Sequence, residues 1–201
     1  FCDLEILCDK RALIPRPETE ELVELLVARF KDSPPADILD LGTGTGAIAL
    51  ALAKAFPQAR VLAADRSQEA LALAKENAAK NALADRIEFL NTNWFEGVPA
   101  RRFGLIVSNP PYLTAQEIQS AAVQVRAHEP ASALLAEDNG LADLKTIISG
   151  ARAFLEAGGL LALETGIDQH TALEKLASDT GFLHTQSLCD LSGRERFFLI
   201  Q

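Results

Sequence analysis

A glycine-rich loop, Gly-Thr-Gly-Thr-Gly at residues 42–46, constrains the fold of this chain more than any other segment. It follows a short apolar run at residues 37–41 and precedes an apolar stretch at residues 47–56, which ends at Pro57. Glycines at such a junction let the backbone turn sharply and let a ligand lie against it without a Cβ clash. The helix N-terminus beyond the loop presents free N–H groups and a positive dipole end. The segment therefore predicts a strand–loop–helix unit that holds a ligand with a carboxylate or phosphate group.

Strands and helices alternate along the rest of the chain. Apolar runs predict seven strands, near residues 37–41, 60–64, 86–90, 104–108, 160–164, 182–188 and 195–200. Apolar residues at helical spacing predict helices near residues 47–56, 67–80, 140–156 and 168–179. This alternation is typical of an α/β, Rossmann-like fold with a mostly parallel sheet and helices on both faces. The last two strands have no helix between them and should pair as an antiparallel hairpin.

The segment before the first strand is expected to form a separate lead-in. Residues 1–14 look like a short β-hairpin, and an amphipathic helix should run from about Pro17 to about Phe30. Proline suits the first turn of a helix, and the glutamates that follow it favour the positive dipole end. We therefore divide the chain into a hairpin with a lead-in helix, residues 1–34, and a ligand-binding domain, residues 35–201.

The charge balance bears on what the chain can bind. Its 201 residues are 48% hydrophobic and 23% charged, an ordinary balance for one mid-sized globular domain. The net charge is −9, and the basic residues occur in small groups rather than in a stripe. Because phosphate contacts dominate affinity for nucleic acid, a large surface that binds duplex DNA or RNA is disfavoured. A small basic patch at the edge of a binding site is still compatible with the sequence.

The sequence predicts neither a membrane-spanning segment nor a metal site. No apolar run is long enough to span a bilayer, and the first residues show no secretory signal. The three cysteines, Cys2, Cys8 and Cys189, have no metal-ligand spacing, and their odd number favours reduced thiols. We therefore expect a monomeric cytoplasmic protein without a bound metal.

Two acidic residues flank the glycine loop. Asp65 ends the second predicted strand, 19 residues after Gly46, where a carboxylate can accept hydrogen bonds from both ribose hydroxyls of an adenosine. Asp40, just before the loop, is placed to accept a hydrogen bond from an ammonium group. Nicotinamide and flavin dinucleotides use similar loops, but their pattern is Gly-x-Gly-x-x-Gly, and no nicotinamide partner follows. The spacing therefore favours S-adenosylmethionine.

The tetrapeptide Asn109-Pro110-Pro111-Tyr112 follows the predicted strand 104–108, which should adjoin the first strand. The two prolines stiffen the backbone, so the Pro110 carbonyl and the Asn109 amide oxygen form a rigid pair of acceptors. An amide or aryl-amino nitrogen is a poor nucleophile because its lone pair is delocalised. Two groups that accept hydrogen bonds from its N–H groups can align that lone pair with a methyl donor. Tyr112 offers a π face to a flat group or a sulfonium. The tetrapeptide and the glycine loop together predict a methyltransferase that acts on a planar nitrogen.

Over essentially its whole length the chain resembles the catalytic domain of the HemK family, protein-(glutamine-N5) methyltransferases of peptide-chain release factors. The segment Pro15-Arg16-Pro17 is the part most selective for that family. The other matching positions are Ile14, Glu18 to Glu20, Asp40 to Gly46, Asp65, Asn93 to Phe95, Asn109 to Tyr112, Glu129-Pro130, Ala133-Leu134, Gly140-Leu141, Glu164, Gly166, Gln169, Asp190-Leu191 and Gly193-Arg194. The resemblance implies a class I methyltransferase fold.

The resemblance also implies roles for single residues. The loop residues that would cradle S-adenosylmethionine are Gly42, Thr43, Gly44, Thr45 and Gly46. Asp65 would hold the ribose, and Trp94, next to Asn93, would flank the adenine. Asn109 would contact cofactor and substrate, and Pro110, Pro111 and Tyr112 would line the pocket for the glutamine of a release-factor Gly-Gly-Gln loop. Catalysis would rest on Asn109, Pro110 and Tyr112.

Two departures from the family pattern stand out. The family usually has Asp at the position of Asn93, so the contact with the adenine amino group should differ. The family's N-terminal helical domain, which helps to dock the release factor, is expected to be missing from this chain.

Several other positions have no assigned chemistry. Arg16, Glu129, Glu164 and Arg194 match the family, and each is expected to form a buried ion pair or to anchor a loop. Of the three histidines, His128 is expected in a loop and His170 and His184 on the surface.

Three other functions remain as alternatives to glutamine methylation. The tetrapeptide also suits an exocyclic amino group of adenine or guanine in nucleic acid, although the acidic charge disfavours it. The glycine loop alone would suit an oxidoreductase. A binding module without catalysis is disfavoured by the intact Asn109.

Overall fold

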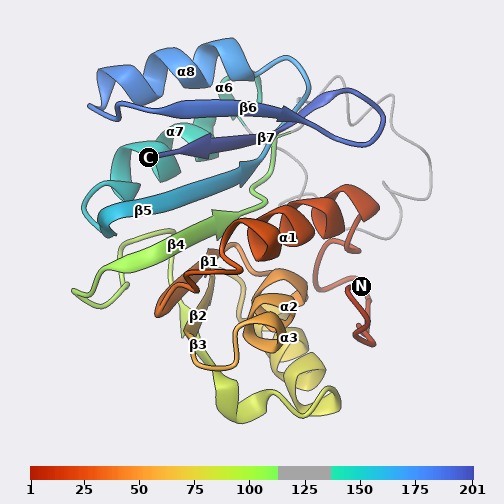
Figure 1. Ribbon diagram of the computed structural model, residues 1–201. Helices are drawn as coiled ribbons and strands as arrows, with labels where there is room; N and C mark the ends of the chain where they lie inside the picture. Colours follow the sequence, from red (N-terminus) through yellow and green to blue (C-terminus); the bar gives the residue numbers. More distant parts are fainter. Residues whose placement is uncertain (113–136) are drawn as a thin grey trace.

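The computed structural model describes residues 1–112 and 137–201. In these residues a seven-stranded sheet has the order β3-β2-β1-β4-β5-β7-β6 (Figure 1). The strands are β1 (Asp37–Leu41), β2 (Arg60–Asp65), β3 (Ile87–Asn91), β4 (Phe103–Ser108), β5 (Leu155–Glu164), β6 (Thr185–Cys189) and β7 (Glu195–Ile200). The helices are α1 (Pro17–Arg29), α2 (Ala47–Ala55), α3 (Gln68–Lys80), α6 (Glu137–Gly140), α7 (Ala142–Ala151), α8 (His170–Asp179) and the 3-10 helix η1 (Ala84–Arg86).

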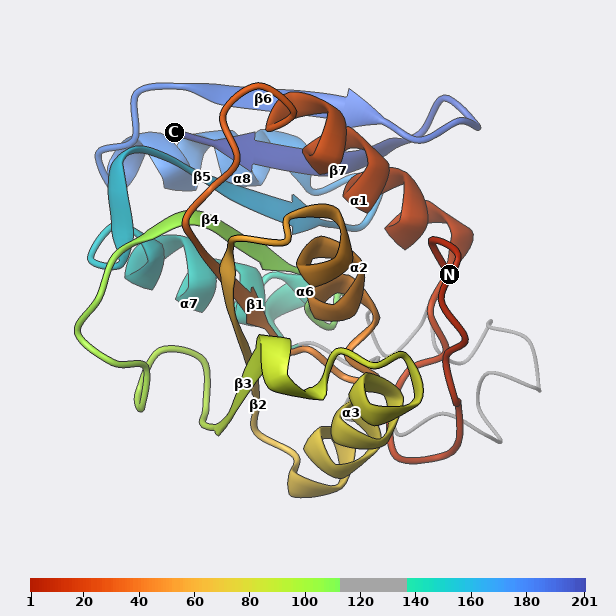
Figure 2. The same cartoon turned by 60° about the horizontal axis from the view of Figure 1, so that its bottom comes forward.

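Helices cover both faces of the sheet, as Figures 1 and 2 show. α1, α2 and α3 pack on one face, and α7 and α8 pack on the other. Side chains alternate along a strand, so β4 contributes Leu105 and Val107 to the first core and Ile106 to the second. The central strands β1 and β4 are therefore buried at nearly every position, as expected for parallel strands between two helical layers.

The expected fold class is confirmed. The strands β3, β2, β1, β4 and β5 pair in parallel, and β4 adjoins β1 as predicted. β7 is antiparallel to both β5 and β6, so the last two strands form the predicted hairpin. In α/β sheets the carboxyl ends of the parallel strands lie at one edge, and this edge is where ligands bind.

The N-terminal segment differs from the hairpin expected over residues 1–14, since it contains turns but no strand. It runs beside α3 instead. Asn77 accepts a hydrogen bond from the Leu7 backbone N–H (2.7 Å) and donates one to the Leu7 carbonyl (3.1 Å). Asn81 makes the same pair of bonds with Glu5, at 3.2 and 2.9 Å. Side-chain amides on one face of a helix thus replace the partner strand.

The start of β5 also differs from expectation. The helix predicted over residues 140–156 ends at Ala151, and β5 begins at Leu155, which pairs with Phe103. The pairing register shifts after Phe103, and the Gly158-Gly159 pair falls in the extra residues of β5. Gly158 has φ of 78°, a left-handed conformation. The two glycines therefore form an irregularity within a strand and do not end a helix.

The described residues contain no membrane-spanning helix and no disulfide. In the described part of the chain, no helix has the length and apolarity needed to cross a bilayer. Cys2, Cys8 and Cys189 are all free thiols, and only Cys2 is partly buried. Burial raises the pKa of the Cys2 thiol to about 11, so this thiol is protonated at neutral pH.

Candidate functional site

A cleft lies at the carboxyl ends of β1, β2 and β4 and encloses about 1000 Å³ of empty space, including its open mouth. Its floor is the glycine loop between β1 and α2. Its walls come from the end of β2, the loop after β3, the start of the tetrapeptide and the N-terminal segment. The cleft is therefore the candidate functional site of the described residues.

The glycine loop has the backbone that its sequence predicts. Gly42 and Gly46 have φ of 71° and 83°, in the left-handed region where a side chain would be strained. A Cβ on Gly46 would lie 3.0 Å from the Cβ of Ala74, so α2 and α3 can approach only because this residue is glycine. The Gly46 N–H donates to the Thr43 carbonyl (2.8 Å) and closes the turn.

Asp40 lies behind the loop and not in the lining of the cleft. Its Oδ2 accepts hydrogen bonds from the Thr43 hydroxyl (2.6 Å) and from the Ala49 backbone N–H (3.2 Å). Its Oδ1 is buried and has no hydrogen-bond partner among the described residues. Burial raises the pKa of Asp40 to about 7, against the lowering effect of these two hydrogen bonds. The carboxyl group therefore holds the loop and has an unsatisfied acceptor beneath it.

Asp65 ends β2 and lines the cleft. Its two oxygens accept hydrogen bonds from the backbone N–H groups of Gly44 (2.9 Å) and Ser67 (2.8 Å). An ionised carboxylate has about four lone-pair sites, so two acceptor positions remain. Asp65 thus joins the glycine loop to the start of α3 and can still accept hydrogen bonds from a ligand.

Trp94 and Asn93 line the cleft in the loop after β3. The Trp94 indole N–H donates to Asp143 of α7 (3.2 Å), which sets the plane of the ring. A Cβ on Gly42 would lie 3.4 Å from the Cζ3 atom of this ring, so the glycine keeps a side chain out of the space beside the ring. Asn93 is exposed, and its side chain donates to Glu96 (2.9 Å).

Asn109 lies at the end of β4 and lines the cleft. Its amide Nδ2 donates to the hydroxyl of Thr19 (3.1 Å), the third residue of α1. Thr19 is buried and donates in turn to Glu164 at the end of β5 (2.6 Å). Ser108 ties β4 to β1 through a bond to the Leu41 carbonyl (2.7 Å). Three distant segments therefore meet at Asn109.

Tyr112 lies outside the lining of the cleft. Its hydroxyl donates to Glu164 (3.2 Å), and the Arg196 guanidinium lies 5.8 Å from the centre of its ring. Burial raises the pKa of Tyr112, and so does the charge of Glu164. One π face of Tyr112 is therefore next to a cation of the chain itself.

The two prolines of the tetrapeptide lie differently. Pro111 lines the cleft, whereas Pro110 is buried and outside the lining. The end of the tetrapeptide is held by Gln169, whose Nε2 donates to the carbonyls of Tyr112 (3.3 Å) and Gly140 (3.0 Å). No peptide bond of the described residues is cis.

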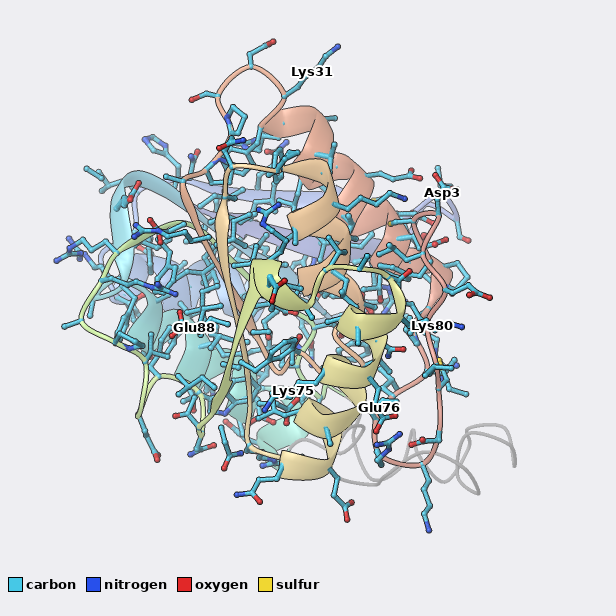
Figure 3. The ribbon with its side chains drawn as sticks, turned by 90° about the horizontal axis from the view of Figure 1, so that it is seen from below. Asp3, Lys31, Lys75, Glu76, Lys80 and Glu88 are labelled. Atoms are coloured by element: carbon cyan, nitrogen blue, oxygen red, sulfur yellow. The ribbon has the colours of Figure 1, made fainter. Side chains whose placement is uncertain are left out.

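The N-terminal segment supplies part of the cleft that the sequence did not predict. Arg11, Ala12, Leu13 and Pro15 all line it. Arg11 bonds Glu76 of α3 through both ends of its guanidinium (2.7 and 2.8 Å), and Figure 3 shows Glu76 on the side of α3 that faces this segment. The resemblance in the Pro15-Arg16-Pro17 motif was the only sequence signal for this wall.

Thr19 and Glu164 are the site residues whose roles the sequence did not assign. Arg16 is the N-cap residue of α1. Arg194 anchors a loop, as expected, through hydrogen bonds to Asp190 (2.9 Å) and Glu18 (3.1 Å). Glu129 lies outside the described residues.

The expectation for His170 was wrong. Its side chain is 2% exposed, and its ring nitrogens lie 2.8 Å from the Thr165 hydroxyl and 2.5 Å from the Ser187 hydroxyl. The start of α8 packs on the sheet and buries the first helical residue. His184 is exposed as expected, and His128 lies outside the described residues.

The chain is similar to known methyltransferases. The family model "Methyltransferase small domain" matches residues 18–142. The release factor glutamine methyltransferase of Salmonella typhimurium is 44% identical over 196 residues, which cover 98% of this chain and 70% of that protein. The protein of the same name from Escherichia coli is 41% identical, over 99% of this chain and 71% of that protein.

A solved structure has the same fold. The ribosomal protein L11 methylase of Lactobacillus delbrueckii subsp. bulgaricus superimposes with a TM-score of 0.69 at 25% identity. The match covers 94% of this chain and 80% of that structure.

Proposed function

The chain belongs to the family of release factor glutamine methyltransferases, and from this premise we propose that it methylates the side-chain amide nitrogen of a glutamine in a peptide-chain release factor. S-adenosylmethionine is the methyl donor. The target is the glutamine of a Gly-Gly-Gln loop, as in the HemK family. The names of the relatives favour this substrate over an exocyclic amino group of nucleic acid.

The residues of the cleft fit S-adenosylmethionine. Gly42 keeps a side chain away from the Trp94 ring, against which an adenine ring would lie, and Asp65 has acceptor positions left for ribose hydroxyls. Asp40 Oδ1 is a buried acceptor without a partner, so an ammonium group on the loop above it would be stabilised. Gly42 to Gly46 and Asn93 complete the site. When bound, the cofactor supplies an electrophilic methyl group on a sulfonium.

Catalysis by this chain is a matter of orientation. The Asn109 amide oxygen and the Pro110 carbonyl oxygen each accept a hydrogen bond from one N–H group of the substrate amide. Pro111 and Tyr112 complete the glutamine pocket. Held in this way, the nitrogen presents its lone pair to the methyl group. Acceptors fixed in advance need not reorganise during the reaction, which makes them more effective than water.

The observation that carries the proposal is the position of Asn109 in the lining of the cleft that the glycine loop and Asp65 form. A fixed amide at this position, at the carboxyl ends of β1 and β4, would lie beside a cofactor held by the loop. A binding module would have no need for both features in one cleft.

The test is methylation of a purified release factor by the purified protein with S-adenosylmethionine. Mass spectrometry of the peptide with the Gly-Gly-Gln loop should show a gain of one methyl group, located on the glutamine by fragmentation. A release factor with that glutamine replaced by glutamate is the matched substrate control and should gain nothing. Methylation of transfer or ribosomal RNA with no gain on the release factor would reject the proposal.

The remaining features follow from the same function. We infer that residues 35–201 form the methyltransferase domain, since the seven strands of the described sheet lie there, and that residues 1–34 form its lead-in. The protein works as a monomer in the cytoplasm, where release factors act, and contacts nucleic acid only indirectly through the ribosome.

A further inference from the structure

Two consecutive hydrogen bonds, the first partly buried and the second buried, run from the cleft to the end of β5. Asn109 Nδ2 donates to Thr19 Oγ1 (3.1 Å), and the Thr19 hydroxyl donates to Glu164 Oε2 (2.6 Å). Thr19 and Glu164 are only 4% and 1% exposed, so water cannot easily replace either bond. No described residue donates a hydrogen bond to the other end of the amide, Asn109 Oδ1.

The direction of these bonds is set by Glu164. Its two oxygens face the hydroxyl groups of Thr19 and Tyr112, and in its ionised form the carboxylate can only accept, so the single proton of the Thr19 hydroxyl then points to Glu164. The hydroxyl then offers a lone pair to Asn109, and only the NH₂ end of the amide can face a lone pair. Of the two orientations of the Asn109 amide, which differ by exchange of the oxygen and the NH₂ group, this one directs the oxygen to the cleft.

Glu164 is held in place from its second oxygen. Tyr112 donates to Oε1 (3.2 Å), so one carboxylate contacts the tetrapeptide directly at one end and through Thr19 at the other. Burial raises the pKa of Glu164, and the bonds from Thr19 and Tyr112 oppose the rise. The net direction of the pKa shift is upward, so the bond direction described above holds while Glu164 is ionised, the form that these two donors stabilise.

We propose that Glu164, acting through Thr19, is a positioning residue that keeps the amide oxygen of Asn109 directed to the substrate nitrogen. The proposal rests on the proposed function, because this orientation matters only where the substrate donates N–H bonds to Asn109. Neither Glu164 nor Thr19 needs to touch the substrate.

The sharpest variant is Glu164→Gln, which keeps the shape of the side chain but adds a donor. Its NH₂ group can donate to Thr19, which frees the hydroxyl to donate to Asn109 Oδ1 and lets the amide turn over. The variant then presents an NH₂ group to the substrate N–H. We expect kcat to fall by about 10²-fold, as when one fixed partner of a reacting group is lost, while affinity for S-adenosylhomocysteine changes by less than about twofold.

Two changes at Thr19 test the link itself. Thr19→Val keeps the volume and removes the hydroxyl, so kcat should fall, whereas Thr19→Ser keeps the hydroxyl and should retain activity. Because Glu164 acts through Thr19, adding Glu164→Gln to Thr19→Val should lower kcat by no more than about threefold further. Additive losses in the double variant would overturn the proposal. If Glu164→Gln fails to fold, the Thr19 pair carries the test alone.

The matched control is Thr165→Val, next to Glu164 in the chain. Thr165 is buried and its hydroxyl bonds His170, away from the cleft. This variant should lose stability in thermal unfolding yet keep the wild-type kcat. If Glu164→Gln and Thr19→Val lose only stability as well, their role is structural and the proposal is wrong.

A second measurement separates this proposal from the proposed function. Solvent exchange of the Asn109 side-chain NH₂ protons, followed by NMR with labelled asparagine, needs no substrate. Exchange should be slow in the wild type and in Thr19→Ser, and at least about tenfold faster in Thr19→Val and Glu164→Gln. If this pattern holds but no release factor is methylated, the proposed function fails and the positioning stands. Equal exchange rates in all four proteins would reject the positioning.

Discussion

Asp40 illustrates how a single buried group can make ligand binding depend on pH. Burial raises its pKa to about 7, and its Oδ1 has no partner among the described residues. Below this pKa the carboxyl group is protonated and neutral, and above it the group is charged. A ligand cation near the loop favours the charged form, so binding of such a ligand should lower the pKa of Asp40.

The first prediction follows from this linkage. Affinity for S-adenosylhomocysteine should weaken by about tenfold when the pH falls from about 8 to about 6, because binding must then release a proton from Asp40. Asp40→Asn should bind more weakly at the higher pH and show no such dependence. Isothermal titration calorimetry in buffers of different ionisation enthalpy would also count the proton released. A wild-type affinity that is flat across this range would contradict the assignment.

The second prediction concerns Asn109. Asn109→Ala removes one of the two acceptors for the substrate N–H bonds, so kcat should fall by about 10²- to 10³-fold. The glycine loop and Asp65 are untouched, so affinity for S-adenosylhomocysteine should change much less than kcat. Single-turnover methylation of a release factor, with the affinity measured separately, gives both numbers. Unchanged turnover would remove Asn109 from the mechanism.

At the scale of elements, α3 holds both the glycine loop and the N-terminal wall of the cleft. Asn77 is fully buried and donates to the Thr45 carbonyl (2.9 Å) as well as to Leu7. Asn81 is only partly buried; it donates to the Asn77 carbonyl of its own helix (2.9 Å) and bonds the N-terminal segment at Glu5, but it does not contact the glycine loop. The two asparagines, one turn apart, thus form a matched pair that differ in their contact with the loop.

The third prediction uses this pair. Asn77→Ala leaves buried backbone groups of two segments unpaired and should cost about 2–4 kcal/mol of unfolding free energy, with weaker cofactor binding. Asn81→Ala, in a more exposed place, should cost about 1 kcal/mol or less and leave cofactor affinity unchanged. Urea denaturation and calorimetry measure both. Equal effects of the two substitutions would show that the contact with Thr45 contributes nothing.

Elements also show where sequence patterns mislead. The glycine pair 158–159 predicts the end of a helix, but it lies inside β5, because Leu155 pairs with Phe103 before the irregularity. Residues 1–14 look like a hairpin in the sequence, but side chains of Asn77 and Asn81 supply the partners of that backbone. In both cases the hydrogen-bond partners of the segment come from a part of the chain far away in sequence. A pattern read over a short stretch of residues cannot reveal such partners.

At the scale of the whole molecule, the net charge of −9 limits the partners. Phosphate contacts supply most of the affinity for nucleic acid, and an acidic protein releases few counterions on binding. A protein substrate has no such requirement. The charge is therefore consistent with a protein partner, although it does not select one.

The fourth prediction tests this limit. Binding to duplex RNA at physiological salt should be no tighter than a Kd of about 10⁻⁴ M, the weak end of the non-specific range. Fluorescence anisotropy of a labelled duplex, repeated at several salt concentrations, would measure it. Micromolar binding with a steep salt dependence would reopen methylation of a nucleic acid.

The sequence by itself indicated the fold class, the adjacency of β1 and β4, the glycine-rich loop with Asp65, and the tetrapeptide. These are local patterns: strand, turn and helix periods within about thirty residues, each with its own physical cause. Only the tertiary structure brought Thr19 and Glu164, 145 positions apart, to the amide of Asn109. A hydrogen-bond direction depends on which side chains meet inside the core, and that meeting is decided by packing of the whole chain.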